Sequence, residues 1–396
     1  MNVRILLLAL GMFVMGTETF MIAGLLPAIA EDFRVSVSVA GQLVTAFSLG
    51  YAIGSPVLMT ITGRAERRKL LAWSLVAFAV GNAICGLAVS YGMMLAGRII
   101  AAAAAGLFSP VASAAASALV SPEKRGRALS MVIGGQTVAL ILGVPFGTYL
   151  SFGYHWSLPF WIVAGGSLLT AALIRRLFPA VPSPGAIPLK ERLSYLKRPA
   201  ILSALLTTLM WGIALFSVYT YIAELYFGFG ATGNMISLVL LIGGIAGFVG
   251  VILGGLEADK IGPARTIALA LTALAVSLAA MSVLNEASGF AGRLNVALVL
   301  GALYGVSSYA FNPAQQHRLI GMSGPSAGIV LSLNASAIYL GSAFGAFLGE
   351  LVLQYGSVAV LGHFGGLWSL LALMLLGANR GLARTKQVRR GPTATE

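Results

Sequence analysis

Two charged residues, Glu18 and Arg98, stand inside long apolar stretches of this 396-residue sequence. A charge at the centre of a membrane costs about 2.5–3.5 kcal/mol on insertion scales and usually serves a function. A carboxylate there can bind and release a proton, because burial and a nearby arginine act in opposite directions on its proton affinity. A helical rise of ~1.5 Å per residue places both side chains at a similar depth. We therefore expect them to pair or to face one aqueous cavity.

Both residues also have a structural interpretation. Glu18 could be an acid tied to a neighbouring helix, and Arg98 a donor that braces backbone carbonyls. In the functional alternative, Glu18 carries a proton and Arg98 responds to its protonation state. Two further acids, Glu224 and Glu350, are predicted near the ends of their apolar segments and would be next in line for proton binding.

Uncharged polar residues within other apolar segments are candidates to line a substrate cavity. Amide side chains in membrane helices equally serve as hydrogen-bonding groups between helices, so both interpretations remain open. The candidates are Gln136, Asn312, Asn334 and Tyr339.

The composition places these residues in a membrane protein. Hydrophobic residues make up 58% of the chain and charged residues 9%, with a mean hydropathy of +0.92. Soluble domains carry about 25% charged residues. Backbone exposed to lipid must satisfy its own hydrogen bonds, which favours helices. A β-barrel would show alternating segments of ~10 residues, whereas these apolar runs are long and continuous. We predict an all-α fold.

The apolar runs predict twelve membrane-spanning helices, each long enough to cross a bilayer. They cover residues 5–27, 41–62, 70–89, 93–119, 129–151, 157–175, 200–225, 236–257, 265–284, 295–316, 327–352 and 359–379.

The basic residues predict the orientation. Of the 25 Lys and Arg residues, 22 fall on one set of connections and on the terminal segments, two on the other set, and Arg98 inside a span. Cytoplasmic loops carry the excess of basic residues, so both termini are predicted to be cytoplasmic. The net charge of +13 is then an orientation signal, and a nucleic-acid partner is not expected.

The chain divides into two similar halves. Residues 1–175 form a predicted six-helix bundle, 176–199 a cytoplasmic linker, 200–379 a second bundle, and 380–396 a basic tail. In the linker, "LKERLSYLKR" is predicted to form a short amphipathic helix. Short basic turns follow the second span of each half, "TGRAERRKLL" and "ADKIGPARTI". Paired halves around a central site are typical of transporters.

The stretch "GGLEADKIGPAR" resembles the signature loop of the Major Facilitator Superfamily, Gly-x-x-x-Asp-(Arg/Lys)-x-Gly. Gly255, Asp259, Lys260 and Gly262 occupy its positions. The resemblance implies a gating loop, in which Gly255 lets helices approach closely and Asp259 caps a helix or bridges the seam between the halves.

The first copy of this loop is degraded. Met59, Gly63 and Glu66 replace the glycine, the acid and the second glycine, while Arg64 and Arg67 remain. The two loops are therefore not expected to be equivalent, and Glu66 is a weak substitute for the missing acid.

Further segments resemble the bacterial twelve-helix drug/proton antiporters of this superfamily, a group that includes sugar or arabinose efflux permeases. They are "GTETFMIAGLLPAIAEDF", "GQLVTAFSLGYAIGSP" and "LNASAIYLGSAFGAFLGE". Arg98 lies where the family has a buried arginine. Gly143, Pro145 and Gly147 in "GVPFGTYL" resemble the antiporter motif, although Val144 separates a Gly-Pro pair that is usually adjacent.

The resemblance implies a monomeric secondary transporter in a bacterial inner membrane, surrounded by lipid. It would exchange a small organic molecule, such as a drug, sugar or metabolite, for protons by alternating access. An uptake symporter or uniporter and a non-transporting membrane sensor remain alternatives. No phosphate-binding loop, nucleophile elbow or metal-ligand spacing is present in the sequence, so we expect no enzyme activity, no cofactor and no metal.

Overall fold

The structure is a computed structural model of the 396-residue chain that describes residues 3–121, 124–181, 185, 188–287 and 292–389. The described residues form helices and no strands. Twelve of the helical segments are long and apolar enough to cross a membrane, which confirms the predicted number.

The spans of the first half are α1 (Val3–Phe33), α2 with α3 (Val37–Ala40, Gln42–Ile61), α4 (Arg67–Gly86), α5 (Tyr91–Ala118), the continuous α6–η2–α7 (Arg125–Val138, Ala139–Gly143, Val144–Gly153) and α8 (Leu158–Leu177). Those of the second half are α10 (Pro199–Tyr219), α12 (Gly233–Ile261), α13 (Pro263–Glu286), α14 (Arg293–Ser323), α15 (Ala327–Tyr355) and α16 (Val360–Arg389). Short elements are α9 (Leu189–Ser194), η3 (Tyr195–Lys197), α11 (Ile222–Gly228) and η4 (Gly324–Ser326).

The predicted end of the seventh span was wrong. The seventh span was predicted to run to residue 225, but α10 ends at Tyr219 and α11 begins at Ile222. Between them, Tyr221 is buried and donates its hydroxyl to the Ala346 carbonyl at 2.8 Å, which ties the break to α15. The twelfth span, Val360–Ala378, agrees with the predicted range 359–379. Its helix α16 continues into the predicted tail as far as Arg389, and residues 390–396 lie outside the described part.

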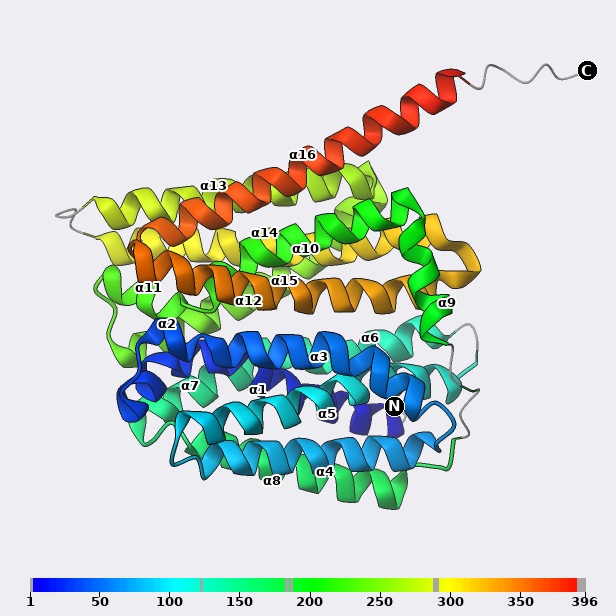
Figure 1. The fold of residues 1–396 in the computed structure, drawn as a ribbon, viewed down its shortest axis with the longest axis horizontal. Helices are drawn as coiled ribbons and strands as arrows, with labels where there is room; N and C mark the ends of the chain where they lie inside the picture. Colours follow the sequence, from blue (N-terminus) through cyan, green and yellow to red (C-terminus); the bar gives the residue numbers. More distant parts are fainter. Residues whose placement is uncertain (1–2, 122–123, 182–184, 186–187, 288–291, 390–396) are drawn as a thin grey trace, which may run out of the picture.

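The helices form two layers with the same internal packing (Figure 1). In the first half, α1 packs on α6 and α8, α5 on α3 and α4, and α4 on α8. In the second half, α10 packs on α15 and α16, α14 on α12 and α13, and α13 on α16. The order of the helices is thus repeated, which is the arrangement expected of two related bundles.

The ends of the bundle differ in what they carry (Figure 1). The start of α1, the end of α16 and the linker helix α9 lie at one end, which we call the terminus side. The short helices α2 and α11 lie at the other end, which we call the opposite side.

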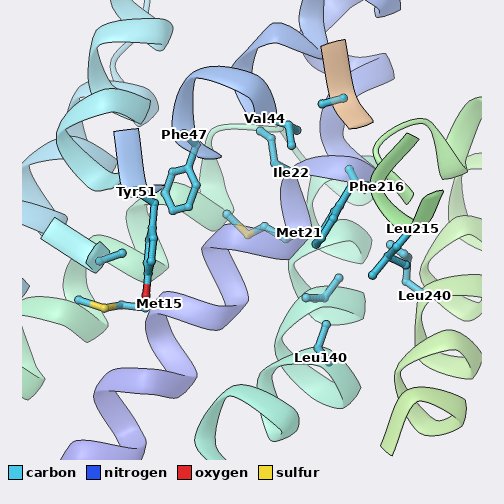
Figure 2. Close-up of a cluster of buried hydrophobic side chains, with 14 of the residues drawn as sticks. Met15, Met21, Ile22, Val44, Phe47, Tyr51, Leu140, Leu215, Phe216 and Leu240 are labelled. Carbon is cyan, nitrogen blue, oxygen red and sulfur yellow. The ribbon is translucent and has the colours of Figure 1, made fainter. Parts of the chain in front are cut away.

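The two halves meet along a seam that is closed on the opposite side. One line of contact joins α12 to η2 and α7, and another joins α3 to α15. Along α3 and α15 the paired residues are Gln42 with Glu350, Thr45 with Ala343, Ser48 with Ser342, and Tyr51 with Tyr339. Behind them, a buried cluster joins Met15, Phe47 and Tyr51 to Leu215 and Leu240 of the other half (Figure 2).

The seam is hollow on the terminus side. A cavity of about 280 Å³ lies between α3, α10 and α15, with α9 and η3 along its edge. Its α3 wall begins at Ala52, directly after Tyr51, and its α15 wall ends at Leu340, directly after Tyr339. The tyrosine pair is therefore the boundary between the closed and the hollow parts of the seam.

Candidate functional site

Glu18 of α1 and Arg98 of α5 form an ion pair inside the first half. The Arg98 Nη1 donates a hydrogen bond to Glu18 Oε1, and both side chains are completely buried. Arg98 also directs its Nε toward the Leu43 carbonyl at 3.4 Å, and its Cζ lies 4.3 Å from the centre of the Phe47 ring. The guanidinium thus joins α1, α3 and α5.

Small residues hold α5 in this position. Gly97 precedes the arginine and packs on α4, where a Cβ would lie 2.8 Å from the Gly81 carbonyl oxygen and 2.6 Å from Cys85 Sγ. The α4 backbone and the buried thiol therefore fill the space beside Gly97. This close packing fixes the depth at which Arg98 emerges from its helix.

The ion pair leaves one polar atom unused on each partner. Glu18 Oε2 and Arg98 Nη2 are buried and have no hydrogen-bond partner among the described residues. A carboxylate oxygen without a donor is a site where a proton can be added. Buried ionic groups are costly unless their remaining hydrogen bonds are satisfied, so this pair is a place where a change of protonation has a large effect.

A pair of tyrosines connects this ion pair to the seam. The rings of Tyr51 and Tyr339 stack with centroids 3.6 Å apart and planes inclined by 18°. Ser109 lies near the Tyr51 side chain and Gln136 near that of Tyr339. Tyr51 follows Phe47 by one turn of α3, and the Phe47 ring contacts the Arg98 guanidinium. The ion pair, Phe47 and the tyrosine pair thus lie in sequence from the first half to a residue of the second half.

The residues that resemble the antiporter motif pack against α1 beside the buried acid. A Cβ at Gly143 would collide with the Thr17 side chain, and a Cβ at Gly147 would lie 2.9 Å from Met21 Sδ. Pro145 lies in the first turn of α7, directly after the π-helical turn η2. These residues set the distance between the fifth span and the helix that carries the acid.

The basic residues of the first loop act within their own half. Arg64 is exposed. Arg67 donates from Nη1 to the Ala114 carbonyl at 2.7 Å, which joins α4 to α5. Glu66 pairs with Arg68 at 3.2 Å and therefore provides no acid to the second half in this structure.

The second loop differs from one expectation in the state described here. Asp259 was expected to cap a helix or bridge the seam, but its Oδ1 lies 3.6 Å from His317 Nδ1 of α14, in the same half. Lys260 pairs with Glu257 at 3.9 Å within α12. Gly262 ends α12 with a φ of 88°, a backbone conformation that favours glycine in the turn to α13.

The role expected of Gly255 was also wrong. No atom lies within 4 Å of a Cβ built on Gly255, whereas Cβ atoms at Gly250 and Gly254 would collide with the Val306 and Ala310 carbonyls of α14. The glycines that permit close approach therefore lie on the adjacent face of α12. Their spacing of four residues is the signal in the sequence that identifies this face.

Two amides predicted as cavity candidates have other partners. Asn334 is buried and accepts a hydrogen bond from Thr208 at 2.7 Å, and Gln315 donates to the same hydroxyl at 3.0 Å. Asn312 accepts from Gln316 of its own helix at 3.1 Å. Asn334 thus joins α15 to α10, as the alternative interpretation expected.

None of the four candidates, Gln136, Asn312, Asn334 and Tyr339, is among the residues that line the cavity. Its walls are formed by leucine, serine, alanine and proline side chains and by one arginine of the linker. For the part of the lining that the linker provides, the amphipathic pattern of "LKERLSYLKR" was the indication in the sequence. Its basic residues were interpreted only as evidence for the orientation in the membrane.

The two remaining acids differ in their environments. Glu350 is buried, accepts a hydrogen bond from Gln42 Nε2 at 2.9 Å across the seam, and has no partner for Oε2 among the described residues. Glu224 lies in α11, outside the spans, where partial burial raises the pKa of its carboxyl. Glu350 therefore belongs to the closed part of the seam.

The sequence matches the profile of the Major Facilitator Superfamily over residues 8–319. It is 32% identical over 94% of both chains to the uncharacterized MFS-type transporter YbcL of Bacillus subtilis. It is also 32% identical to the chloramphenicol resistance protein of Streptomyces lividans, over 96% of both chains. The inner membrane transport protein YdhP of Escherichia coli K12 is 31% identical over 94% of this chain and 96% of its own.

Solved structures share the fold. The D-xylose-proton symporter superimposes with a TM-score of 0.74 at 18% identity, over 94% of this chain and 96% of its own. The nucleoside transporter NupG superimposes with a TM-score of 0.73 at 12% identity, over 95% and 99%. The twelve helices, the signature loop and these matches agree: the chain belongs to the Major Facilitator Superfamily and is a multi-pass transporter rather than an enzyme.

Proposed function

We propose that this transporter exports a small organic molecule in exchange for protons and that Glu18 carries the proton. The buried ion pair with Arg98, in which Glu18 Oε2 has no partner among the described residues, is the observation that carries the proposal. Protonation makes Glu18 neutral and removes the attraction that holds the guanidinium. Loss of the proton restores the ion pair, so the two states differ in how α1 and α5 are held.

The tyrosine pair transmits this change to the seam. Tyr339 belongs to the second half, yet it stacks on Tyr51, which follows Phe47 by one turn of α3. A shift of the arginine also moves Phe47, because the guanidinium lies over its ring. Protonation would thereby loosen contacts that close the opposite side, which is the coupling that alternating access requires.

Two observations support export. One relative is named a chloramphenicol resistance protein, and removal of the compound from the cell would account for resistance. The count of basic residues assigns the terminus side to the cytoplasm. With this orientation the cavity lies on the side from which an exporter collects its substrate. A reporter fused after Glu396 should then be active only as a cytoplasmic marker, and periplasmic activity would contradict the orientation.

The two signature loops are proposed to close the terminus side in the other half of the cycle. Arg64 and Lys260 lie at corresponding turns of the two bundles, and Asp259 is largely exposed and reachable by a partner. In the present structure Asp259 and Lys260 pair within their own half, as expected of a gate that is open. Asp259→Asn should therefore slow transport without loss of folded protein.

The test is uphill transport in proteoliposomes with an imposed pH gradient, with radiolabelled chloramphenicol as the first probe. Glu18→Gln is permanently neutral and cannot release a proton, so uphill transport should be lost while downhill exchange survives. Glu257→Gln is the matched control, because that acid is partly exposed near the end of α12 and lies outside the buried ion pair. Uphill transport by Glu18→Gln at the wild-type rate would show that Glu18 is structural. Wild-type movement of probe together with protons would establish a symporter.

A further inference from the structure

The cavity on the terminus side has walls of two chemical kinds. Leu205, Leu206 and Leu209 of α10 face Leu333 and Leu340 of α15 across an apolar space. Its volume of about 280 Å³ is close to the lower end of the range for small-molecule pockets, which suits a compact molecule of one or two rings. Burial of such a molecule against leucines is favourable by about 25 cal/mol per Å² of apolar surface.

One edge of the cavity carries a positive charge. Arg192 of the linker helix α9 is among the lining residues, and the described part of the lining contains no other charged side chain. Its Nε is buried and has no hydrogen-bond partner among the described residues. A guanidinium binds carboxylate and similar anions through parallel hydrogen bonds, and the Nε–H belongs to the donor set that does so.

The linker is anchored so that this arginine faces the cavity. Tyr195, which follows α9, donates a hydrogen bond from its hydroxyl to Ser326 Oγ of the second half at 2.6 Å. The Arg198 guanidinium lies over the Tyr195 ring, 4.8 Å from its centre. The α9 helix also contacts α3 of the first half. The linker thus crosses the seam at the edge of the cavity.

We propose that this cavity binds an amphipathic anion, with its apolar body between α10 and α15 and its anionic group on Arg192. The inference rests on the proposed function in treating the cavity as the place of the transported molecule. It assigns Arg192 as a specificity-determining residue for substrates that carry a carboxylate or sulfonate. The serines Ser55, Ser332 and Ser336 provide the remaining polar contacts along the walls.

Binding of 2-naphthoate and of its neutral analogue 2-naphthamide to the full-length protein in phosphatidylcholine nanodiscs tests the proposal. The wild-type protein should bind naphthoate more tightly than naphthamide. Arg192→Gln should weaken naphthoate binding by about tenfold or more, the loss expected when a charged hydrogen bond is removed, and leave naphthamide unchanged. Lys190→Gln is the matched control, because Lys190 is an exposed cation of the same helix that does not line the cavity.

One further variant and a change of lipid define the remaining outcomes. Leu340→Trp fills the apolar part and should abolish binding of both probes. Equal affinity for the two probes, or an Arg192→Gln protein that binds naphthoate like the wild type, would overturn the proposal. In nanodiscs with phosphatidylglycerol, unchanged naphthoate binding identifies a soluble anion as the occupant. If phosphatidylglycerol instead weakens naphthoate binding to the wild-type protein but not to Arg192→Gln, the occupant is an anionic lipid with the same chemistry.

This measurement is independent of the proton-carrying role of Glu18. No pH gradient is applied, and Glu18→Gln protein should bind naphthoate with wild-type affinity. If the wild-type protein binds naphthoate as expected but Glu18→Gln retains pH-driven transport, only the coupling proposal is rejected. If the wild-type protein does not bind naphthoate but Glu18→Gln loses pH-driven transport, only the proposed substrate class is rejected.

Discussion

At the scale of single residues, the ion pair between Glu18 and Arg98 determines how strongly a substitution of either residue destabilises the folded protein. Removing one partner leaves a buried charge without compensation, which typically destabilises a protein by about 3–5 kcal/mol. We expect Arg98→Gln to lower the thermal unfolding temperature strongly. The double variant Glu18→Gln/Arg98→Gln should be more stable than Arg98→Gln alone, since no isolated charge remains. Thermal unfolding of the purified variants in detergent measures this difference.

The control is the exposed pair of Glu257 and Lys260, whose atoms lie 3.9 Å apart. Exposed pairs contribute about 0–1 kcal/mol, so their single and double substitutions should have small and additive effects. Losses at Glu18 and Arg98 that simply add would show that the two charges are independent in the folded protein.

The sequence was informative about these two residues and uninformative about their neighbours. A charge within an apolar run is conspicuous, and the helical rise placed Glu18 and Arg98 at the same depth. Tyr51 and Tyr339 are ordinary membrane residues by type, and their stacking depends on how two distant helices approach. Arg192 resembled every other basic residue of the linker, because its contact with the cavity depends on the path of the chain.

At the level of helices, α12 offers a sharp test in two adjacent glycines. A Cβ at Gly254 would collide with the Ala310 carbonyl of α14, whereas nothing lies within 4 Å of one at Gly255. Gly254→Ala should therefore lower the unfolding temperature and the yield of folded protein. Gly255→Ala should be neutral or slightly stabilising, because alanine is favoured over glycine in a helix by about 1 kcal/mol. Equal losses would contradict the packing described for α12.

The existence of the helices followed from hydropathy, but their interruptions did not. Long apolar runs predicted all twelve spans. The break between α10 and α11 is set by the bond from Tyr221 to the Ala346 carbonyl, and no local pattern of residues encodes that contact. The role assigned to Gly255 failed for a related reason. The signature loop indicated which glycine belongs to the motif. The position of the neighbouring helix α14 determines at which glycine a side chain would collide.

For the whole molecule, the closed part of the seam predicts a cross-link. The hydroxyls of Ser48 and Ser342 lie 2.9 Å apart across the seam. Cysteines at both positions, in a Cys85→Ala background, should form a disulfide that holds the opposite side closed and stops transport until a reductant is added. Mass spectrometry and transport before and after reduction measure the two effects. Efficient transport by the oxidised protein would contradict alternating access at this seam.

Cysteines at Ser55 and Ser336 are the matched control on the terminus side. Both positions line the cavity, one on α3 and one on α15, so they should remain uncross-linked in the state described here. Which side of the seam is closed could not be predicted from the sequence, because the same residues must form both states. The number of helices could be predicted from the apolar runs, and the two related halves could be predicted from the repeated basic turns.

The π-helical turn η2 changes the direction in which the later residues of the fifth span point. On an ideal α-helix, residues spaced by four drift around the axis by about 40° at each step. Gly135, Ala139, Gly143 and Gly147 follow this spacing, yet they all face α1, because one wider turn from Ala139 to Gly143 rotates the later residues back. Removal of one residue from that turn, such as Leu142, would rotate one part of the span against the other by about 100°. The small residues would then face α1 over only half of the span, and Glu18 would lose the fixed wall beside it.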